Sequence, residues 1–426
     1  MGNARETAVR GLIEVFDRNG FSNLVLDSLM RQDELSPQDR AFCSALFYGV
    51  VEKRITLDWV LKQYSETPMA ETTSAVREIL RLALYQLIFM PSVPPSAAVD
   101  EAVKLTRVFR AEIAAGFVNG VLRSFLRSEM AFALPKHRLD QLSVQYSVPT
   151  ELLALWNTVY GKDKTAEILS GIGGPPPIFA RVNTLKTTVE ELIPLLQEEG
   201  VTAEPAGFPG ALRLYEMGSV TALSSFEKGL FHIQDLSSQQ CAAALGVLPG
   251  MRVLDVCSAP GGKSFTLAET MENSGELLAM DLSGNRLSLV SSGAERLGIT
   301  ILRTSINDAA KPNSLLGQFD RILCDVPCSG YGVIRRKPEI RYKTPESVRE
   351  LPALQLQILT VSSGYLAPGG RMVYSTCTLN RAENEKVVQS FLLAHSDFAL
   401  DGEMTTVFPT KEGGDGFFFA PIARRT

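Results

Sequence analysis

The chain has few histidines and no closely paired cysteines, and these absences exclude two kinds of site. It contains 3 histidines and 6 cysteines in 426 residues, and no two cysteines form a C-x-x-C pair. Structural zinc sites need clustered cysteine and histidine ligands, and disulfide scaffolds are typical of short secreted chains. We therefore expect no metal site, and the scattered thiols favour the reducing cytoplasm.

Long apolar runs and a positive net charge are also absent. No hydrophobic stretch reaches the roughly 20 residues that a membrane-spanning helix needs, and the N-terminus lacks a signal-peptide core. The formal net charge is −5, so any nucleic-acid site must be a local basic patch. We expect a multidomain protein with no membrane partner, most simply a monomer.

Helical patterns dominate residues 1–130. Ser36 followed by Pro37 is typical of a helix start. Apolar residues between 76 and 87 recur at helical spacing. This region carries no constellation of catalytic residues, so the sequence predicts an all-α interaction module.

The pattern changes after a connector at 131–150. Residues 151–235 mix short strands with one helix, which indicates a small α+β domain resembling an RNA-recognition fold. In 236–426 strands and helices alternate regularly. That alternation predicts a doubly wound, Rossmann-like α/β domain whose ligands bind at the carboxyl ends of the strands.

A loop of small residues follows the predicted strand 253–256. It runs from Cys257 to Gly262 and leads into a helix at Lys263, an arrangement in which bare backbone and helix N–H groups meet a ligand. The dinucleotide fingerprint is absent. A phosphate-loop pattern fits at 262–264 but lacks its first glycine. S-adenosylmethionine is the third possibility, because Asp281 ends the next strand and could accept ribose hydroxyls; a purely structural turn is the alternative.

Further acids and two cysteines also follow predicted strand ends, which converge on one crevice in this fold. They are Asp308, expected to bond the adenine amino group, Asp325, Cys328 and Cys377. A thiolate that adds to carbon 6 of a pyrimidine makes carbon 5 able to attack a sulfonium methyl. Lys263 would lower the pKa of such a thiol, and Asp325 could act at ring nitrogen 3. Chemistry alone does not say which cysteine attacks, and a free cysteine is often only a small buried hydrophobe.

A basic segment lies close to these cysteines in the sequence. Residues 330–343 contain five cations and one acid, interleaved with two tyrosines. Such a segment suits single-stranded RNA with a splayed base, although a solvated loop is the alternative. With two residues of the predicted strand at 179–183, the candidate RNA contacts are Arg181, Asn183, Arg335, Arg336, Lys337 and Arg341.

Three stretches resemble the RNA cytosine-5 methyltransferases. They are residues 257–263, the Asp-Val-Pro-Cys-Ser-Gly run at 325–330 and the Ser-Thr-Cys-Thr run at 375–378. Near the N-terminus, stretches including 39–49 and 80–87 are similar to the NusB family of RNA-binding helical domains. Together they make nearly the whole chain similar to bacterial 16S ribosomal RNA cytosine-5 methyltransferases; Ser258 and Val326 replace the usual alanines without removing a chemical group.

The resemblance implies an enzyme that uses S-adenosylmethionine to form 5-methylcytosine in 16S ribosomal RNA, at a single-stranded or loop cytosine, through a covalent bond to carbon 6. It implies that Cys377 is the nucleophile and that Cys328 assists product release. It implies a cofactor site made of Cys257, Ser258, Ala259, Pro260, Gly261, Gly262, Lys263, Asp281, Arg286, Asp308 and Asp325. The helical domain would contact RNA or only brace the enzyme. Transfer RNA as substrate, a phosphate-loop NTPase and a non-catalytic assembly factor remain alternatives.

Overall fold

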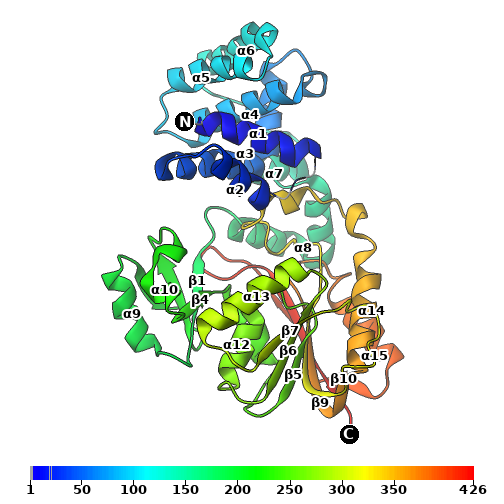
Figure 1. Cartoon of the computed structure of the whole chain (residues 1–426). Helices are drawn as coiled ribbons and strands as arrows, with labels where there is room; N and C mark the ends of the chain where they lie inside the picture. Colours follow the sequence, from blue (N-terminus) through cyan, green and yellow to red (C-terminus); the bar gives the residue numbers. More distant parts are fainter. Residues whose placement is uncertain (1–2, 19, 21) are drawn as a thin grey trace. The chain divides into compact units, whose positions relative to one another are not determined.

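The computed structural model describes residues 3–18, 20 and 22–426. They form two compact units (Figure 1). The helical unit comprises the chain up to Ala154 together with Lys337–Tyr342, and the sheet unit comprises Leu155–Arg336 with Lys343–Thr426. Among the described residues, no helix has the length and hydrophobicity needed to cross a membrane.

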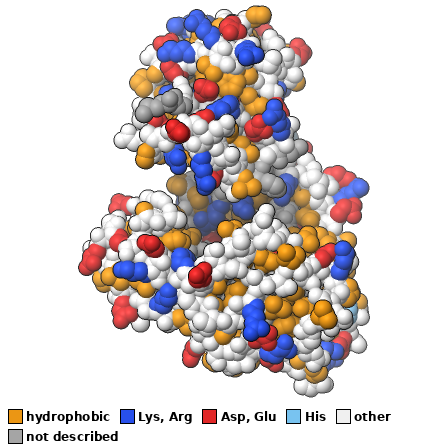
Figure 2. Space-filling model, in the orientation of Figure 1, with side chains coloured by type: hydrophobic (Ala, Val, Ile, Leu, Met, Phe, Trp, Pro, Cys, Tyr) orange, Lys and Arg blue, Asp and Glu red, His pale blue; other side chains and the backbone are white. Residues whose placement is uncertain are grey.

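The helical unit confirms the all-α prediction for the N-terminal region. Its helices are α1 (Ala4–Arg18), α2 (Ser22–Gln32), α3 (Pro37–Tyr64), α4 (Ser74–Phe89), α5 (Pro95–Val108), α6 (Ala115–Arg127) and α7 (Arg138–Tyr146). Helix α3 begins as predicted: the Ser36 hydroxyl accepts a hydrogen bond from the Asp39 backbone N–H at 3.1 Å. Basic and acidic side chains are mixed on the face of this unit that Figure 2 shows.

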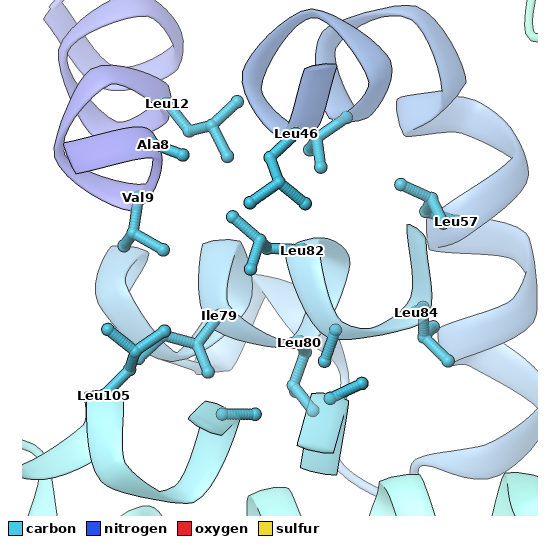
Figure 3. Close-up of a cluster of buried hydrophobic side chains, with 14 of the residues drawn as sticks. Ala8, Val9, Leu12, Leu46, Leu57, Ile79, Leu80, Leu82, Leu84 and Leu105 are labelled. Atoms are coloured by element: carbon cyan, nitrogen blue, oxygen red, sulfur yellow. The ribbon is translucent and has the colours of Figure 1, made fainter. Parts of the chain in front are cut away.

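Helix α4 is the centre of the helical core. Figure 3 shows its leucines and Ile79 facing side chains from three other helices. These include Leu12 of α1, Leu46 of α3 and Leu105 of α5, all at most 2% exposed. Burial of each such side chain stabilises the fold by roughly 2 kcal/mol. The apolar stripe predicted between 76 and 87 is therefore a packing feature.

The stretch expected to be a connector, 131–150, contains helix α7. This helix packs on α3, because the Thr56 hydroxyl donates to the Val144 carbonyl at 2.6 Å and the Ile55 N–H donates to the Ser147 hydroxyl at 3.0 Å. The next helix, α8 (Thr150–Gly171), is interrupted at Gly161, whose φ of 82° lies in the left-handed region.

A small antiparallel sheet opens the β structure of the sheet unit. Its strands are β1 (Ile178–Val182), β2 (Thr202–Pro205), β3 (Ala211–Tyr215) and β4 (Phe231–Ile233), in the order β2-β3-β1-β4. Helix α9 (Val189–Glu198) begins at a capping box between Thr188 and Glu191. This is the small α+β fold that the sequence predicts.

The large sheet has a parallel core that carries the site. Its strands are β5 (Arg252–Asp255), β6 (Glu276–Asp281), β7 (Leu302–Ile306), β8 (Phe319–Asp325), β9 (Leu366–Thr376), β10 (Phe398–Leu400), β11 (Thr405–Val407) and β12 (Phe417–Arg424). The order is β10-β12-β9-β8-β5-β6-β7, with β11 paired to β12. The five neighbouring strands β9, β8, β5, β6 and β7 run parallel, while β12 is antiparallel to β9. The predicted doubly wound α/β architecture is confirmed.

Helices connect and cover the strands of the large sheet (Figure 1). They are α11 (Leu236–Ala244), α12 (Gly262–Thr270), α13 (Gly284–Leu297), α14 (Leu351–Ser363) and α15 (Glu385–Ala394). The helix expected over 345–366 is shorter, because β9 already begins at Leu366, which pairs with Phe319 beside an irregularity in the β8 register.

Candidate active site

The loop after β5 holds a fixed backbone conformation at the centre of the large sheet. The Ser258 N–H donates to the Met280 carbonyl at 2.7 Å, and the Gly261 N–H donates to the Ser258 carbonyl at 2.8 Å. Gly261 has a φ of 111°, and a Cβ at this position would lie 2.4 Å from Cζ of Phe265. Only glycine suits this position, where helix α12 begins.

Asp281 is held against this loop. Its Oδ2 accepts the Ala259 N–H at 3.3 Å, and its Oδ1 accepts the Ser283 N–H at 3.0 Å. Arg286 lies 3.3 Å from Asp281 Oδ2 and also donates to the Ala259 carbonyl. The structure thus brings together the loop, the acid and the arginine that the sequence places in one cofactor site.

Apolar side chains near Asp281 complete a surface that the sequence reasoning missed. Leu282 follows Asp281 directly, and Ile306 of β7 is the register partner of Asp281 in the sheet. They are 71% and 66% exposed, although both are large and apolar. Asp308 follows two residues later; its hydrogen bonds to Lys311 and the Ala310 N–H lower the pKa of its carboxyl. Apolar walls beside acids suit a flat nucleoside base, and the apolar residues next to the strand-end acids were the available signal.

A cavity of about 270 Å³ lies at the carboxyl end of β5. Its lining residues are Ile233, Gln234, Asp235, Ser238, Asp255, Cys257, Ser258, Ala259, Pro260, Gly262, Lys263, Asp325, Val333, Cys377, Asp415 and Phe417. Cys377, Lys263 and Asp325 therefore face the same space as the loop. Cys328, Asp281, Arg286 and Asp308 are not among the lining residues.

Lys263 and Asp325 form an ion pair in this cavity. Lys263 Nζ lies 2.7 Å from Asp325 Oδ2, and the Ser375 hydroxyl donates to Asp325 Oδ1 at 2.8 Å. Burial works to lower the pKa of Lys263, but the charge and hydrogen bond of Asp325, together with smaller effects of Cys241 and Cys377, outweigh it and raise the pKa above its usual value. Lys263 is therefore a fixed positive charge.

The two cysteines expected at the site lie side by side. Cys328 Sγ is 3.3 Å from Cys377 Sγ, and both side chains are partly exposed. The hydrogen bond to Cys377, together with burial, raises the pKa of the Cys328 thiol. By contrast, Cys43, Cys241 and Cys324 are buried, which raises the pKa of each to about 12. Those three behave as small hydrophobes, as buried free cysteines commonly do.

Three of the candidate RNA contacts are buried in the protein. The Asn183 amide donates to the carbonyls of Gly229 and Leu297, both at 2.8 Å. Arg335 donates to the Gly171 carbonyl at 2.8 Å, and Arg341, within the helical unit, donates to the Ser147 carbonyl at 3.1 Å. Their exposed fractions are 0%, 8% and 1%. The expectation that these three residues contact RNA is therefore corrected. Their side chains hold the fold together, because a buried group bonded to backbone cannot reach a nucleic-acid surface.

Two further arginines are engaged with internal partners. Arg181 donates to the Pro209 carbonyl at 2.6 Å and lies 3.4 Å from Glu269. Arg336 lies 3.0 Å from Asp235 and also bonds Asp415. Two of the five cations of segment 330–343, Arg335 and Arg336, are thus next to acids distant in sequence. Residues 337–342 of the segment belong to the helical unit. Lys337 is exposed, and its RNA contact stays a prediction.

A parallel sheet with a small-residue loop, an acid held against that loop, and two adjacent thiols of which Cys377 lines the cavity is the arrangement of the S-adenosylmethionine-dependent methyltransferases. The comparisons name the family. The family described as 16S rRNA methyltransferase RsmB/F matches residues 242–423. The NusB family matches residues 2–127, and the ferredoxin-like domain of RsmF/B-like methyltransferases matches residues 148–221.

Curated relatives match over the full length. The probable ribosomal RNA small subunit methyltransferase B of Bacillus subtilis (strain 168) is 35% identical over 99% of both chains. The corresponding Synechocystis protein is 35% identical over 100% of both chains, and the ribosomal RNA small subunit methyltransferase B of Yersinia enterocolitica is 34% identical over 99% of both. The chain therefore belongs to the RsmB family of S-adenosylmethionine-dependent RNA methyltransferases.

Solved structures of other proteins share the fold of this chain. The crystal structure of PH0851 matches 98% of both chains with a TM-score of 0.83 and 26% identity. A methyltransferase homolog protein from Pyrococcus horikoshii matches 68% of this chain and 100% of its own, with a TM-score of 0.60 and 30% identity. NSun6 from Pyrococcus horikoshii with SFG shares the fold, with a TM-score of 0.61 and 24% identity over 65% of this chain and 98% of its own.

Proposed function

We propose that this enzyme methylates carbon 5 of a cytosine in 16S ribosomal RNA, with Cys377 as the nucleophile. The observation that carries the proposal is that Cys377 shares a cavity with Lys263, Asp325 and the loop after β5. Cys328 lies 3.3 Å beyond Cys377 but does not line that cavity. The cavity-facing thiol is the one that a base in the cavity would meet first.

S-adenosylmethionine, when bound, supplies a methyl group on a sulfonium. Cys377 Sγ adds to carbon 6, and the resulting enamine makes carbon 5 nucleophilic enough to take that methyl group. A base in solution then takes the carbon-5 proton, the electrons of the broken carbon–hydrogen bond form the carbon-5–carbon-6 double bond, and the electrons of the carbon–sulfur bond return to Cys377 as a thiolate. Cys328, beside Cys377, assists this release.

The ion pair next to Cys377 supports the first step. Lys263 stays protonated because of Asp325, and a fixed cation near a thiol favours the thiolate. Asp325 faces the cavity and would bond the base near nitrogen 3, where the addition changes the charge. In this proposal, Asp325 and Lys263 bind and polarise the base, and Cys377 attacks it.

The cofactor would lie along the loop after β5. The first N–H groups of α12, which begins at Gly262, point to the ligand side of the loop in this proposal, and Asp281 and Arg286 fix the loop. The apolar Leu282 and Ile306 would enclose the adenine ring, with Asp308 at its edge. These donors and walls match a nucleoside that carries a charged amino-acid tail. Asp281 would accept the ribose hydroxyls.

For the substrate, the relatives' names indicate small-subunit ribosomal RNA. We propose that the helical unit, similar to the NusB family, contacts this RNA together with exposed Lys337. A bacterial ribosomal RNA substrate would place the enzyme in the cytoplasm. We expect it to act as a monomer, because the described chain itself holds the cavity, the loop and both cysteines.

The test uses the full-length protein, labelled S-adenosylmethionine and unmethylated 16S RNA. Wild type, Cys377→Ala, Cys328→Ala and the control Cys324→Ala are compared on denaturing gels. We expect a covalent RNA adduct to accumulate with Cys328→Ala, neither adduct nor product with Cys377→Ala, and normal product with Cys324→Ala. Methylation by Cys377→Ala would overturn the assignment of the nucleophile. Methylation of transfer RNA but not of 16S RNA would overturn the proposed substrate.

A further inference from the structure

A buried carboxylate lies behind the two cysteines, and the mechanism above does not use it. Glu383, in the segment between β9 and α15, is 0% exposed. Its Oε1 accepts from the Ser329 hydroxyl at 2.6 Å and from the Asn380 amide at 2.8 Å. Its Oε2 accepts from the Ser329 N–H at 2.8 Å and from the Gln355 amide at 2.9 Å. One side chain thus receives four hydrogen bonds.

These hydrogen bonds join the two segments that carry the thiols. Ser329 follows Cys328, and Asn380 lies three residues after Cys377. Direct bonds between the segments add to this: the Gly332 N–H donates to the Cys377 carbonyl at 3.0 Å. Glu383 is therefore the common partner of both cysteine segments.

Gln355 of α14 fixes the same structure from a third element. Its amide also donates to the Pro327 carbonyl at 2.9 Å, next to Cys328. On the other side, the Tyr374 hydroxyl of β9 donates to the Glu383 carbonyl at 2.5 Å. The backbone and the carboxylate of Glu383 are thus both held, which limits how far either cysteine segment can shift.

The chemistry of the four donors requires a carboxylate. All four are uncharged groups, and a buried carboxylate is tolerated without a cation only where several hydrogen bonds satisfy it. Both oxygens of a carboxylate accept, whereas an amide has one accepting oxygen and one donating nitrogen. A glutamine at this position would turn an N–H group toward another donor and lose at least one of the bonds to the cysteine segments.

We propose that Glu383 is a positioning residue that sets the spacing between the thiols of Cys328 and Cys377. The proposal deepens the two-cysteine mechanism above and rests on it. Two thiols that act in turn on one base must be held within a fraction of an ångström of their working positions. The negative charge of Glu383 also adds to the effects of the Cys377 hydrogen bond and of burial, which raise the pKa of Cys328 and keep it a protonated thiol.

The test compares Glu383→Gln with Glu385→Gln. The control makes the same chemical change two residues away, at a side chain that lies 3.8 Å from Arg381 and outside the cysteine segments. For Glu383→Gln we expect kcat to fall about 10-fold to 100-fold, with an unchanged KM for S-adenosylmethionine and accumulation of the covalent RNA adduct. Ser329→Ala, which removes one of the four bonds, should give a smaller effect in the same direction.

A direct readout of the spacing is the rate at which the two thiols form a disulfide. Diamide takes two electrons and two protons from the thiol pair as the bond forms, and mass spectrometry of the Cys328–Cys377 peptide pair measures the rate. The wild-type sulfurs are 3.3 Å apart and should react quickly. We expect Glu383→Gln to slow the reaction by about 10-fold and Glu385→Gln to leave it unchanged.

Two results would overturn the inference. One is a wild-type rate of disulfide formation in Glu383→Gln. The other is a decrease in activity that is accompanied by equal decreases in cofactor affinity and thermal stability, which would indicate general damage to the fold. A wild-type enzyme that makes no 5-methylcytosine would instead refute the proposed function, and the disulfide rate would still decide whether Glu383 sets the spacing.

Discussion

Each unit contains a largely buried ion pair, and the surroundings of the two pairs differ. In the helical unit, Arg81 Nη1 lies 2.5 Å from Glu78 Oε1, with side chains 8% and 1% exposed. In the sheet unit, Lys263 Nζ lies 2.7 Å from Asp325 Oδ2, with side chains 12% and 27% exposed. The first pair lies within the helical core, but the second lines a cavity with Cys377.

The comparison shows that a buried ion pair does not by itself indicate catalysis. Desolvation offsets much of the attraction in any such pair, so burial alone is weak support for either stability or function. Space for a substrate and a reactive atom within reach are the additional features at Lys263 and Asp325. A variant that removes one partner should therefore lower kcat in the sheet unit and the free energy of unfolding in the helical unit.

The largest expected effect is on the reaction, from Lys263→Met. The variant keeps most of the side-chain length but removes the cation beside Cys377, so the thiolate and the developing charge on the base lose their stabilising partner. We expect kcat to fall about 100-fold to 1000-fold, measured as labelled methyl transfer at saturating RNA. Lys386→Met is the control, because Lys386 is exposed and does not line the cavity. An unchanged kcat in Lys263→Met would contradict the assigned role.

Arg81→Met should reverse this pattern. It leaves Glu78 buried without its nearest cation, and breaking a buried pair in this way costs about 3 kcal/mol of unfolding free energy. Methyl transfer per folded molecule should stay near wild type. Denaturant unfolding followed by circular dichroism measures the stability, and Arg77→Met, which removes a more distant and more exposed partner of Glu78, is the matched control.

A double variant sharpens the result. Arg81→Met combined with Glu78→Gln removes both charges, so much of the lost stability should return if the penalty came from an unpaired carboxylate. A double variant that is no more stable than Arg81→Met would show that the arginine acts through other contacts, such as its hydrogen bonds to Asp58 at 2.7 and 2.8 Å.

The sequence predicted the parts of the site that depend on local pattern and topology. The loop at 257–263 is continuous in sequence, and Asp281 and Asp325 were located because the carboxyl ends of parallel strands share one edge of the sheet. None of these inferences needed a partner from a distant part of the chain.

Partners from distant parts of the chain could not be found from the sequence. Segment 330–343 has a net positive charge, but Arg336 pairs with Asp235 and Asp415, 101 and 79 residues away. The role of Glu383 was missed for the same reason, since Ser329 lies 54 residues from it. Charge can be counted along a sequence, whereas the acid that neutralises it is found only once the chain is folded.

The pH dependence of stability tests a further buried group, Asp255. Burial raises the pKa of this carboxyl from its ordinary 3.8 to about 7. The folded state therefore holds the proton to a higher pH than the unfolded state does, and stability is lost as the pH rises from about 4 through about 7. Asp255→Asn, which keeps an acceptor for the Ser264 hydroxyl, should flatten this part of the profile. Unfolding free energies at pH 4.5, 6 and 7.5 measure it, and an equally steep wild-type and variant profile would contradict the prediction.

The smallest expected effect separates an exposed cation from a buried one in the same segment. Lys337 is exposed, so Lys337→Ala should raise the KM for RNA about 2-fold to 5-fold and leave stability unchanged. The slope of log binding constant against log salt concentration should become less steep by about 1, because one phosphate contact is lost. Arg341→Ala should instead lower the melting temperature, because it leaves the carbonyls of Ser147 and Glu52 without their donor. RNA titrations at several salt concentrations, with melting curves of both variants, measure the difference. A salt slope that changes with Arg341→Ala but not with Lys337→Ala would mean that the arginine leaves its buried position to bind RNA, and the correction made from its burial would itself be wrong.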